Sequence, residues 1–244
     1  MKILITGASS GIGEALSRLY ATKENELYLL ARREERLQKL QTELAPFAKK
    51  VDIIVCDVTD FDNLQRKMRE LQDVDMVILN AGISLGHSLE ITPFEEFKRL
   101  YDVNVLSNHA ILEILLPKFL EKKSGKIVFI SSLASIFSMP SSKVYSSSKR
   151  ALNAYAEGLR YKYEPHGIKV LNILPGFVKS ELTDKNKFYM PFLLGTQDGA
   201  KIIKSAIDKE RRFYAFPRRF YYLILLFKYL PLFLKQKIIK HLFR

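Results

Sequence analysis

Short runs of aliphatic residues alternate along the chain with longer segments in which apolar residues recur at helical spacing. Strands that are apolar at nearly every position are buried on both faces, as in parallel sheets covered by helices on each side. The pattern predicts strands over residues 2–6, 26–31, 51–56, 75–80, 126–131, 169–174 and 213–216. It predicts helices over residues 14–22, 33–44, 62–71, 94–122 and 145–163.

The alternation runs to about residue 216 without an internal repeat or a low-complexity linker. It predicts an α/β fold for residues 1–216, a doubly wound, seven-stranded parallel sheet with helices on both faces. In such sheets, ligands bind in the crevice at the carboxyl ends of the strands. Residues 217–244 follow the last predicted strand and are predicted to form a C-terminal helical extension.

The composition is that of a folded domain, because 48% of the 244 residues are hydrophobic and 27% are charged. The single cysteine, Cys56, excludes an internal disulfide framework and indicates a reducing compartment. Four widely separated histidines lack metal-ligand spacing, so no metal is expected. The chain opens into an apolar strand rather than a leader-like segment, and we therefore expect a cytoplasmic location.

The net charge of +13 is concentrated towards the C-terminus. Residues 201–244 contain 12 Lys and Arg against Asp208 and Glu210, a net charge of +10, which leaves about +3 for the first 200 residues. The main body therefore has the charge balance of an ordinary soluble domain, and the question of a charged partner concerns the extension.

The extension contains an apolar run at 220–227 and a second, amphipathic segment. In that segment apolar positions recur opposite basic ones: Leu234, Ile238, Ile239 and Leu242 against Lys237, Lys240 and Arg244. One interpretation is peripheral association with the cytoplasmic face of an anionic membrane. The other is a pair of helices that roofs the substrate pocket or is buried in a dimer. The apolar stretch 220–234 is short for a membrane span of about 20 residues. Nucleic acid is not an expected partner, because the charges are interleaved with bulky aliphatics.

A glycine-rich turn follows the first predicted strand, with the sequence Thr6-Gly7-Ala8-Ser9-Ser10-Gly11-Ile12-Gly13. Glycines permit a tight turn and a close backbone approach, so that amide groups at the start of the next helix point at a pyrophosphate. The spacing differs from the common G-x-G-x-x-G dinucleotide fingerprint. The position between a strand and a helix is what favours a phosphate-binding turn over a purely structural loop.

This string resembles the cofactor motif of the short-chain dehydrogenase/reductase family, and the resemblance extends over residues 1–216. Further family-like motifs follow in order: Asp57-Val58, Asn80-Ala81-Gly82, Asn104, Ser132, Tyr145 with Lys149, and Pro175-Gly176 with Val178 and Ser180. The resemblance implies a Rossmann-like fold in which Asp57 contacts the adenine and Asn80-Ala81-Gly82 shapes the cofactor cleft. Small departures are Leu79 for a frequent asparagine, Ser107 for a frequent glycine, and Ser180 for a frequent threonine.

The cofactor is predicted to be NADP(H) rather than NAD(H). Ala31 stands where NAD-dependent relatives usually carry an aspartate, and Arg32 offers a charged fork that suits a 2′-phosphate. Ser9 adds a hydroxyl, and Arg33 is the more expendable arginine. In the alternative, Arg32 and Arg33 only begin a solvated helix. The predicted cofactor-binding residues are Gly7, Ser9, Ser10, Gly11, Ile12, Gly13, Arg32, Arg33, Asp57, Val58, Asn80, Ala81, Gly82, Tyr145, Lys149, Pro175, Gly176, Val178 and Ser180.

Ser132, Tyr145, Lys149 and Asn104 are the predicted catalytic residues. Reduction of a carbonyl needs a proton for the developing alkoxide, and Tyr145 is the candidate acid. Lys149 lies four residues on, on the same helix face, where its charge favours the phenolate. The resemblance implies that Lys149 also binds the nicotinamide ribose, that Ser132 holds the substrate oxygen, and that Asn104 holds a water linking Lys149 to solvent. The alternative for Tyr145 and Lys149 is a half-buried tyrosine beside a surface lysine.

The predicted function is that of an NADPH-dependent oxidoreductase that interconverts a carbonyl and an alcohol on a small or lipid-like apolar substrate. The segment Phe188-Tyr189-Met190-Pro191-Phe192-Leu193-Leu194 occupies the place of a family lid and suggests the apolar substrate. It could equally pack on the domain or on another subunit. A homodimer or homotetramer is expected, with helices 94–122 and 145–163 as the interface. The rival hypotheses are a cofactor-binding sensor or scaffold attached through the basic extension, and a related epimerase or dehydratase.

Overall fold

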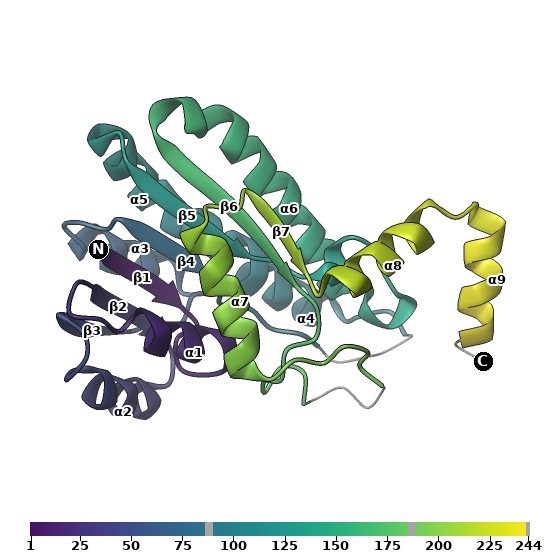
Figure 1. Cartoon of the computed structure of the whole chain (residues 1–244), viewed down its shortest axis with the longest axis horizontal. Coiled ribbons are helices and arrows are strands. Elements are labelled where there is room, and N and C mark those ends of the chain that lie inside the picture. The colour runs from purple at the N-terminus through teal and green to yellow at the C-terminus, as the bar shows by residue number, and fades with distance from the viewer. Residues whose placement is uncertain (86–89, 185–188, 243–244) are drawn as a thin grey trace.

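The computed structural model describes residues 1–85, 90–184 and 189–242, so that Phe188 and Arg244 lie outside the described residues. Within them, one parallel sheet of seven strands has the order β3-β2-β1-β4-β5-β6-β7 (Figure 1). The strands are β1 Lys2–Thr6, β2 Glu26–Ala31, β3 Lys50–Val55, β4 Met76–Leu79, β5 Gly125–Ile130, β6 Ile168–Pro175 and β7 Phe213–Phe216. The predicted doubly wound, seven-stranded parallel sheet is confirmed.

Helices cover both faces of the sheet, as predicted. One face packs against α1 Gly11–Tyr20, α2 Glu34–Leu44 and α7 Thr196–Asp208, and the other packs against α3 Phe61–Glu70, α5 Ser107–Lys122 and α6 Lys143–Tyr163. Successive side chains of a strand point to opposite faces of the sheet, so they pack against opposite helix layers. Ile3 and Ile5 belong to the first layer, and Leu4 between them belongs to the second. This double burial explains why the strands are apolar at nearly every position.

The helix predicted over residues 94–122 contains one widened turn. It consists of α4 Phe94–Tyr101, a π-helical turn at Asp102–Leu106, and α5. Two side chains bond to backbone carbonyls at this turn: Ser107 Oγ donates to Val103 O at 2.7 Å, and Asn108 Nδ2 donates to Asn104 O at 2.7 Å. Such turns are frequent at functional sites, and this one contains Asn104.

Helix α7 was not predicted, although its apolar residues follow a helical pattern. The side chains of Ala200, Ile203, Ala206 and Ile207 are buried against the first layer. Gly199 brings Val178 close, because a Cβ atom built at Gly199 would lie 2.8 Å from Val178 Cγ1. Helix α7 therefore supports the segment that follows β6, which carries part of the predicted cofactor site.

The predicted C-terminal helical extension is confirmed as α8 Arg218–Tyr229 and α9 Leu232–Leu242. Helix α8 begins directly after β7 and packs on the body through Phe220, Tyr221 and Ile224. Figure 1 shows α9, in yellow, standing away from the sheet and its covering helices. Across residues 1–85, 90–184 and 189–242, no helix combines the length and the apolar character that crossing a bilayer requires.

Candidate active site

A cleft of about 390 Å³ lies at the carboxyl ends of the strands, where the fold predicts a ligand. Of the residues predicted for cofactor binding or catalysis, all line this cleft in the described structure except Gly13 and Asn104. The motifs are far apart in the sequence, and the sheet brings them together because parallel strands end at one edge. Within the described residues, no group of three His, Cys, Asp or Glu side chains could hold a metal ion.

The glycine turn is held in a conformation that only glycines tolerate well. Gly7 and Gly11 have φ values of +66° and +56°, and a Cβ atom at Gly13 would lie 2.3 Å from Gly7 O. The turn is fastened to the end of β4, because Thr6 Oγ1 accepts hydrogen bonds from Asn80 N and Ala81 N, both at 3.0 Å. Gly13 thus supports the turn from behind, while Gly7 and Gly11 line the cleft at the start of α1.

Two arginines at the end of β2 reach this turn and its neighbours. Arg33 Nε donates to Ser9 Oγ at 3.2 Å and Nη2 donates to Ser10 Oγ at 2.6 Å. Arg32 Nη1 donates to Asp57 Oδ2 at 3.1 Å. Arg33 therefore contacts the glycine turn directly. The sequence alone predicts Arg33 to be the more expendable of the two arginines. Both guanidinium groups border the cleft beside Ala31, and each contacts a carboxylate of the lining: Arg32 contacts Asp57 and Arg33 contacts Glu181.

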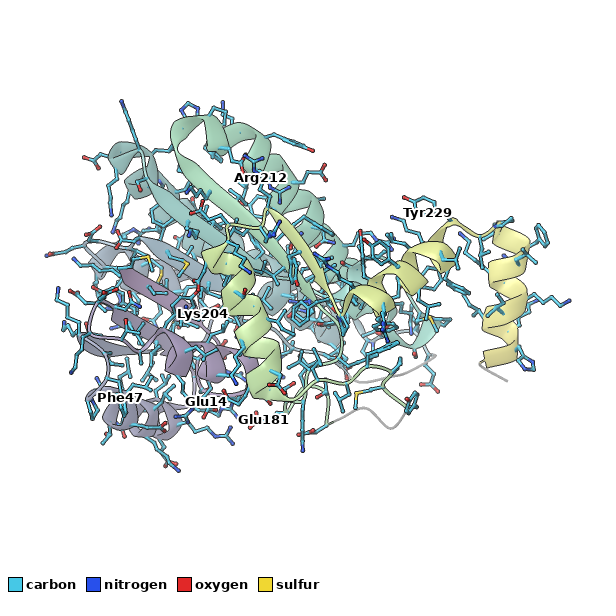
Figure 2. All side chains as sticks on the ribbon, viewed as in Figure 1. Glu14, Phe47, Glu181, Lys204, Arg212 and Tyr229 are labelled. Atoms are coloured by element: carbon cyan, nitrogen blue, oxygen red, sulfur yellow. The ribbon has the colours of Figure 1, made fainter. Side chains whose placement is uncertain are left out.

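Glu181 is a part of this cluster that the sequence did not indicate. Its carboxylate accepts from Arg33 Nη1 at 2.7 Å and also pairs with Arg36. These two arginines, Arg36 most strongly, lower the pKa of Glu181. Glu181 belongs to the segment between β6 and α7, and Figure 2 shows it near the lower end of α7. The ion pairs link that segment to the end of β2 across the cleft.

Asp57 is held at the adenine side of the predicted cofactor site. Its Oδ1 accepts from Thr59 N at 3.0 Å and Thr59 Oγ1 at 2.8 Å. Burial raises the pKa of this carboxyl, but the hydrogen bonds from Thr59 and the contact with Arg32 lower it by more, so the net pKa is below its usual value. Asp57 is therefore an ionised acceptor in a fixed orientation.

Ser132, Tyr145 and Lys149 meet at one point of the cleft wall. Tyr145 and Ser132 share a side-chain hydrogen bond. Lys149 Nζ lies 5.9 Å from the centroid of the Tyr145 ring and donates to Ile130 O at 2.9 Å. Helix α6 is anchored to β5 here, since Ser131 Oγ donates to Lys149 O at 3.2 Å. The predicted surface-lysine alternative does not describe Lys149, which is only 4% exposed.

The environment changes the acidity of both ionisable groups. Burial raises the pKa of Tyr145, and the hydrogen bond from Ser132 opposes that effect in part. Burial lowers the pKa of Lys149 to about 8. A lysine that is charged near neutrality, next to a tyrosine, favours the phenolate and so makes the tyrosine a better proton donor. The three residues together can hold a carbonyl oxygen and supply it with a proton.

Asn104 lies behind the cleft wall and does not line the cleft itself. Its Oδ1 accepts from Ile83 N at 2.8 Å, and its Nδ2 donates to Ile83 O at 3.0 Å and to Ser148 Oγ at 3.1 Å. A Cβ atom built at Gly82 would lie 3.3 Å from Asn104 Oδ1 and 3.5 Å from Lys149 Nζ. Asn104 thus fixes the Ile83 backbone close to Lys149, and the proton relay through a water molecule stays a prediction.

The cleft also has lining residues that no motif indicated, among them Ile83, Arg99 and Thr183. Thr183 Oγ1 accepts from Ser180 N at 2.8 Å and donates towards Val178 O at 3.2 Å. The short spacing Ser-x-x-Thr after the Pro-Gly turn is a signal for such a local turn. Thr183 supplies a threonine hydroxyl close to Ser180, the position where the family more often has threonine.

A second cavity of about 290 Å³ adjoins Tyr145. Tyr145 lines both cavities, and the second is bordered by apolar residues such as Ile91 and Val144 together with Glu90 and Lys143. The described part of the predicted lid, residues 189–194, packs on the extension through Phe192, whose ring centroid lies 5.7 Å from that of Phe220. Tyr189 in the same segment is 87% exposed.

Comparison with known proteins identifies the class to which this site belongs. The model of the short chain dehydrogenase family matches residues 1–188. An uncharacterized oxidoreductase of Myxococcus xanthus is 35% identical over 218 residues, covering 88% of this chain and 86% of that protein. This chain belongs to the short-chain dehydrogenase/reductase family, whose members are oxidoreductases that use a nicotinamide cofactor.

Solved structures agree with the fold. A short-chain dehydrogenase from Sphingobium yanoikuyae in complex with NADPH superposes with a TM-score of 0.82 at 24% identity, covering 88% of this chain and 87% of that one. An alcohol dehydrogenase from Thermococcus sibiricus complexed with 5-hydroxy-NADP gives 0.77 at 26% identity, covering 88% and 94%. The prediction of the family and of its Rossmann-like fold is confirmed.

Proposed function

We propose that this protein is an NADPH-dependent oxidoreductase that interconverts a carbonyl and an alcohol on an apolar substrate, with Tyr145 as the proton donor. The observation that carries the proposal is the meeting of Ser132, Tyr145 and Lys149 in the cleft whose other end is the glycine turn. A protein that only bound the cofactor would not need all three groups at one point, which disfavours the sensor or scaffold hypothesis. The epimerase or dehydratase hypothesis is disfavoured by the glycine spacing.

The residues present fit a dinucleotide. The backbone cradle around Gly7, Gly11 and Gly13 has room only because these residues lack a Cβ atom, and it lies at the N-terminus of α1, where a pyrophosphate is favoured. Asp57 would hold the adenine end, and Lys149 would bind the ribose next to the nicotinamide. When bound, the nicotinamide supplies the hydride for reduction or accepts it for oxidation.

The side chains of the cleft would then bind the substrate oxygen and transfer the proton. The hydroxyl groups of Ser132 and Tyr145 would both donate to the substrate oxygen and so stabilise the charge that develops on it. Tyr145 transfers its proton to that oxygen, and the charge of Lys149 stabilises the phenolate that is left. In the oxidation direction the same groups act in reverse, with the phenolate of Tyr145 as the base.

The preference for NADP(H) is supported by the charge at the end of β2. An NAD site usually presents a carboxylate to the 2′-hydroxyl, which would repel a 2′-phosphate. Here Ala31 leaves that place neutral, and Arg32 and Arg33 surround it with the hydroxyl groups of Ser9 and Ser10. Guanidinium groups bind phosphate with two parallel hydrogen bonds, so this cluster suits the phosphorylated cofactor.

Replacement of both arginines, Arg32→Ala with Arg33→Ala, is expected to raise the dissociation constant for NADPH by about a hundredfold, because charged hydrogen bonds to the phosphate are lost. The dissociation constant for NADH should change much less, since NADH lacks that phosphate. Fluorescence titration of each cofactor measures both values. Arg36→Ala is the matched control, because it removes the other ion pair to Glu181, from helix α2 directly after the two arginines. Equal weakening of NADPH and NADH would contradict the assignment.

An apolar substrate is supported by the surroundings of Tyr145. The second cavity adds Ile91, Pro93 and Val144 to the wall beyond the tyrosine, among a lining that also has charged and hydroxyl side chains. The aromatic rings of Phe177, which follows Gly176 of the cleft wall, and of Phe192 in the predicted lid each lie about 6 Å from Phe220. The charged residues Glu90 and Lys143 at the second cavity would contact a polar end of the substrate.

The test of the proposed function is consumption of NADPH by the purified protein with aldehydes and ketones graded by chain length and ring size. We expect turnover whose kcat/KM rises with apolar size, because each buried methylene adds favourable transfer free energy. Tight binding of NADPH without turnover on any member of the panel would favour the sensor hypothesis. A cytoplasmic location and a dimer or tetramer through α4, α5 and α6 remain predictions, to be checked by localisation and sedimentation.

A further inference from the structure

The extension leaves large apolar side chains in solvent. We define the C-terminal face as the exposed apolar and aromatic residues of α8 and α9: Tyr222, Leu223, Leu226, Tyr229, Leu232, Phe233, Leu234 and Ile238. Their exposed fractions run from 36% for Leu234 to 77% for Tyr229, which Figure 2 marks at the end of α8. So many exposed large apolar side chains on two consecutive helices are more than the single scattered ones of an ordinary surface, and they indicate an interaction site.

The charge around this face identifies the kind of partner. From Arg211 to Arg244 the sequence contains nine Lys and Arg and no Asp or Glu. The side chains of Arg218, Arg219, Lys228, Lys237 and Lys240 are exposed. A partner that fits must therefore be apolar inside and negatively charged at its surface. A bilayer with anionic headgroups has both properties.

A second copy of this chain fits the face less well. In a two-fold symmetric dimer the same patch meets itself, so the basic residues of one copy would face those of the other. No carboxylate in residues 211–244 could neutralise them. The aromatic residues agree with a membrane surface instead, because tyrosine side chains favour the interface between headgroups and acyl chains.

The opposite side of α8 packs against the active-site end of the body. Phe220 and Ile224 pack on Leu133, the residue after Ser132. The ring of Phe220 also lies 5.8 Å from that of Phe177, which follows Gly176 of the cleft wall. Helix α8 thus has its inner side on Leu133 and Phe177, which follow cleft residues in the sequence, and its outer side in the C-terminal face.

We propose that the C-terminal face binds the surface of an anionic lipid bilayer, with its apolar side chains among the acyl chains and its lysines and arginines at the headgroup phosphates. The protein is then peripheral, since α8 and α9 lie along the surface. Since α8 packs on residues that follow cleft residues, binding holds that end of the body near the bilayer, which matters for turnover only if the proposed function holds.

The experiment is flotation of the full-length protein with vesicles of phosphatidylcholine alone or of phosphatidylcholine mixed with phosphatidylserine. We expect flotation with the mixed vesicles, much weaker flotation with neutral ones, and release at high salt. The variant Lys228→Gln, Lys237→Gln, Lys240→Gln should weaken partitioning into the mixed vesicles by about a hundredfold, given the contribution of each basic residue near an anionic surface. The variant Leu223→Ser with Leu226→Ser should weaken it on both kinds of vesicle.

The matched control is Lys23→Gln, Lys39→Gln, Lys162→Gln, which removes the same charge from exposed positions on the body and should float like the unchanged protein. An equal loss in this control, equal flotation with neutral vesicles, or no flotation at all would overturn the proposal. So would a dimer in sedimentation that dissociates in the Leu223→Ser, Leu226→Ser variant. NADPH turnover on a water-soluble carbonyl, measured in every variant, separates a failure of this proposal from a failure of the proposed function.

Discussion

Tyr145→Phe is expected to lower kcat by about a thousandfold while the dissociation constant for NADPH changes little. The substitution removes one hydroxyl group and keeps the ring, so the packing around α6 is preserved. The group that is lost is the one hydrogen-bonded to Ser132 and close to Lys149. Without it, the substrate oxygen receives one hydrogen bond fewer and no proton from the protein.

The measurement is kcat and the NADPH dissociation constant on the same preparation. Tyr155→Phe is the matched control, because Tyr155 lies on the same helix but its hydroxyl contacts His109 Nδ1 at 2.8 Å. Turnover in the control should stay close to that of the unchanged protein. Retained turnover in Tyr145→Phe would remove this tyrosine from the proton path, and a parallel loss of NADPH binding would mean that the substitution disturbs the cofactor site.

The alternating pattern predicted the sheet because burial on both faces leaves a strong signal. Ile3, Leu4 and Ile5 are all apolar since each contacts one helix layer or the other. The widened turn at Asp102–Leu106 leaves no such signal. It adds one residue to a helical turn, and the side chains that bond to its carbonyls, Ser107 and Asn108, also occur in ordinary helices.

The site was predictable where its residues form local motifs. The glycine turn and the Tyr-x-x-x-Lys spacing are set by local backbone geometry, so the sequence places them relative to each other. Glu181 could not be predicted, because its partners Arg33 and Arg36 are about 150 residues away and meet it only in the folded chain. The contacts of Arg33 with Ser9 and Ser10 could not be predicted for the same reason, since they too form only in the folded chain.

Burial of Lys149 in the cleft wall lowers its affinity for a proton, and this brings its titration close to neutral pH. The Lys149 ammonium is removed from water and donates a hydrogen bond to the Ile130 carbonyl at 2.9 Å. Its pKa of about 8 means that the charge is present at neutral pH and is lost just above it. A lysine with the ordinary pKa near 10.4 would keep its charge throughout that range.

Lys149→Met is therefore expected to change the pH dependence as well as the rate. In the unchanged protein, reduction should be fastest below pH 8 and fall as the pH rises through about 8, because Lys149 then loses its proton and no longer stabilises the Tyr145 phenolate. Methionine has no proton to lose, so the variant should lack that limb and have a kcat lower by about a hundredfold. The measurement is kcat for reduction at saturating NADPH on both sides of pH 8.

The control is Lys162→Met, on the exposed end of the same helix. It should retain both the kcat of the unchanged protein and the fall of kcat as the pH rises through about 8. A limb near pH 8 that persists in Lys149→Met would assign the titration to another group. A variant that lost the rate but had lost NADPH binding as well would show Lys149 acting only through the ribose. The combination of a low rate, bound NADPH and a flat profile near pH 8 is the result that ties the charge of Lys149 to proton transfer by Tyr145.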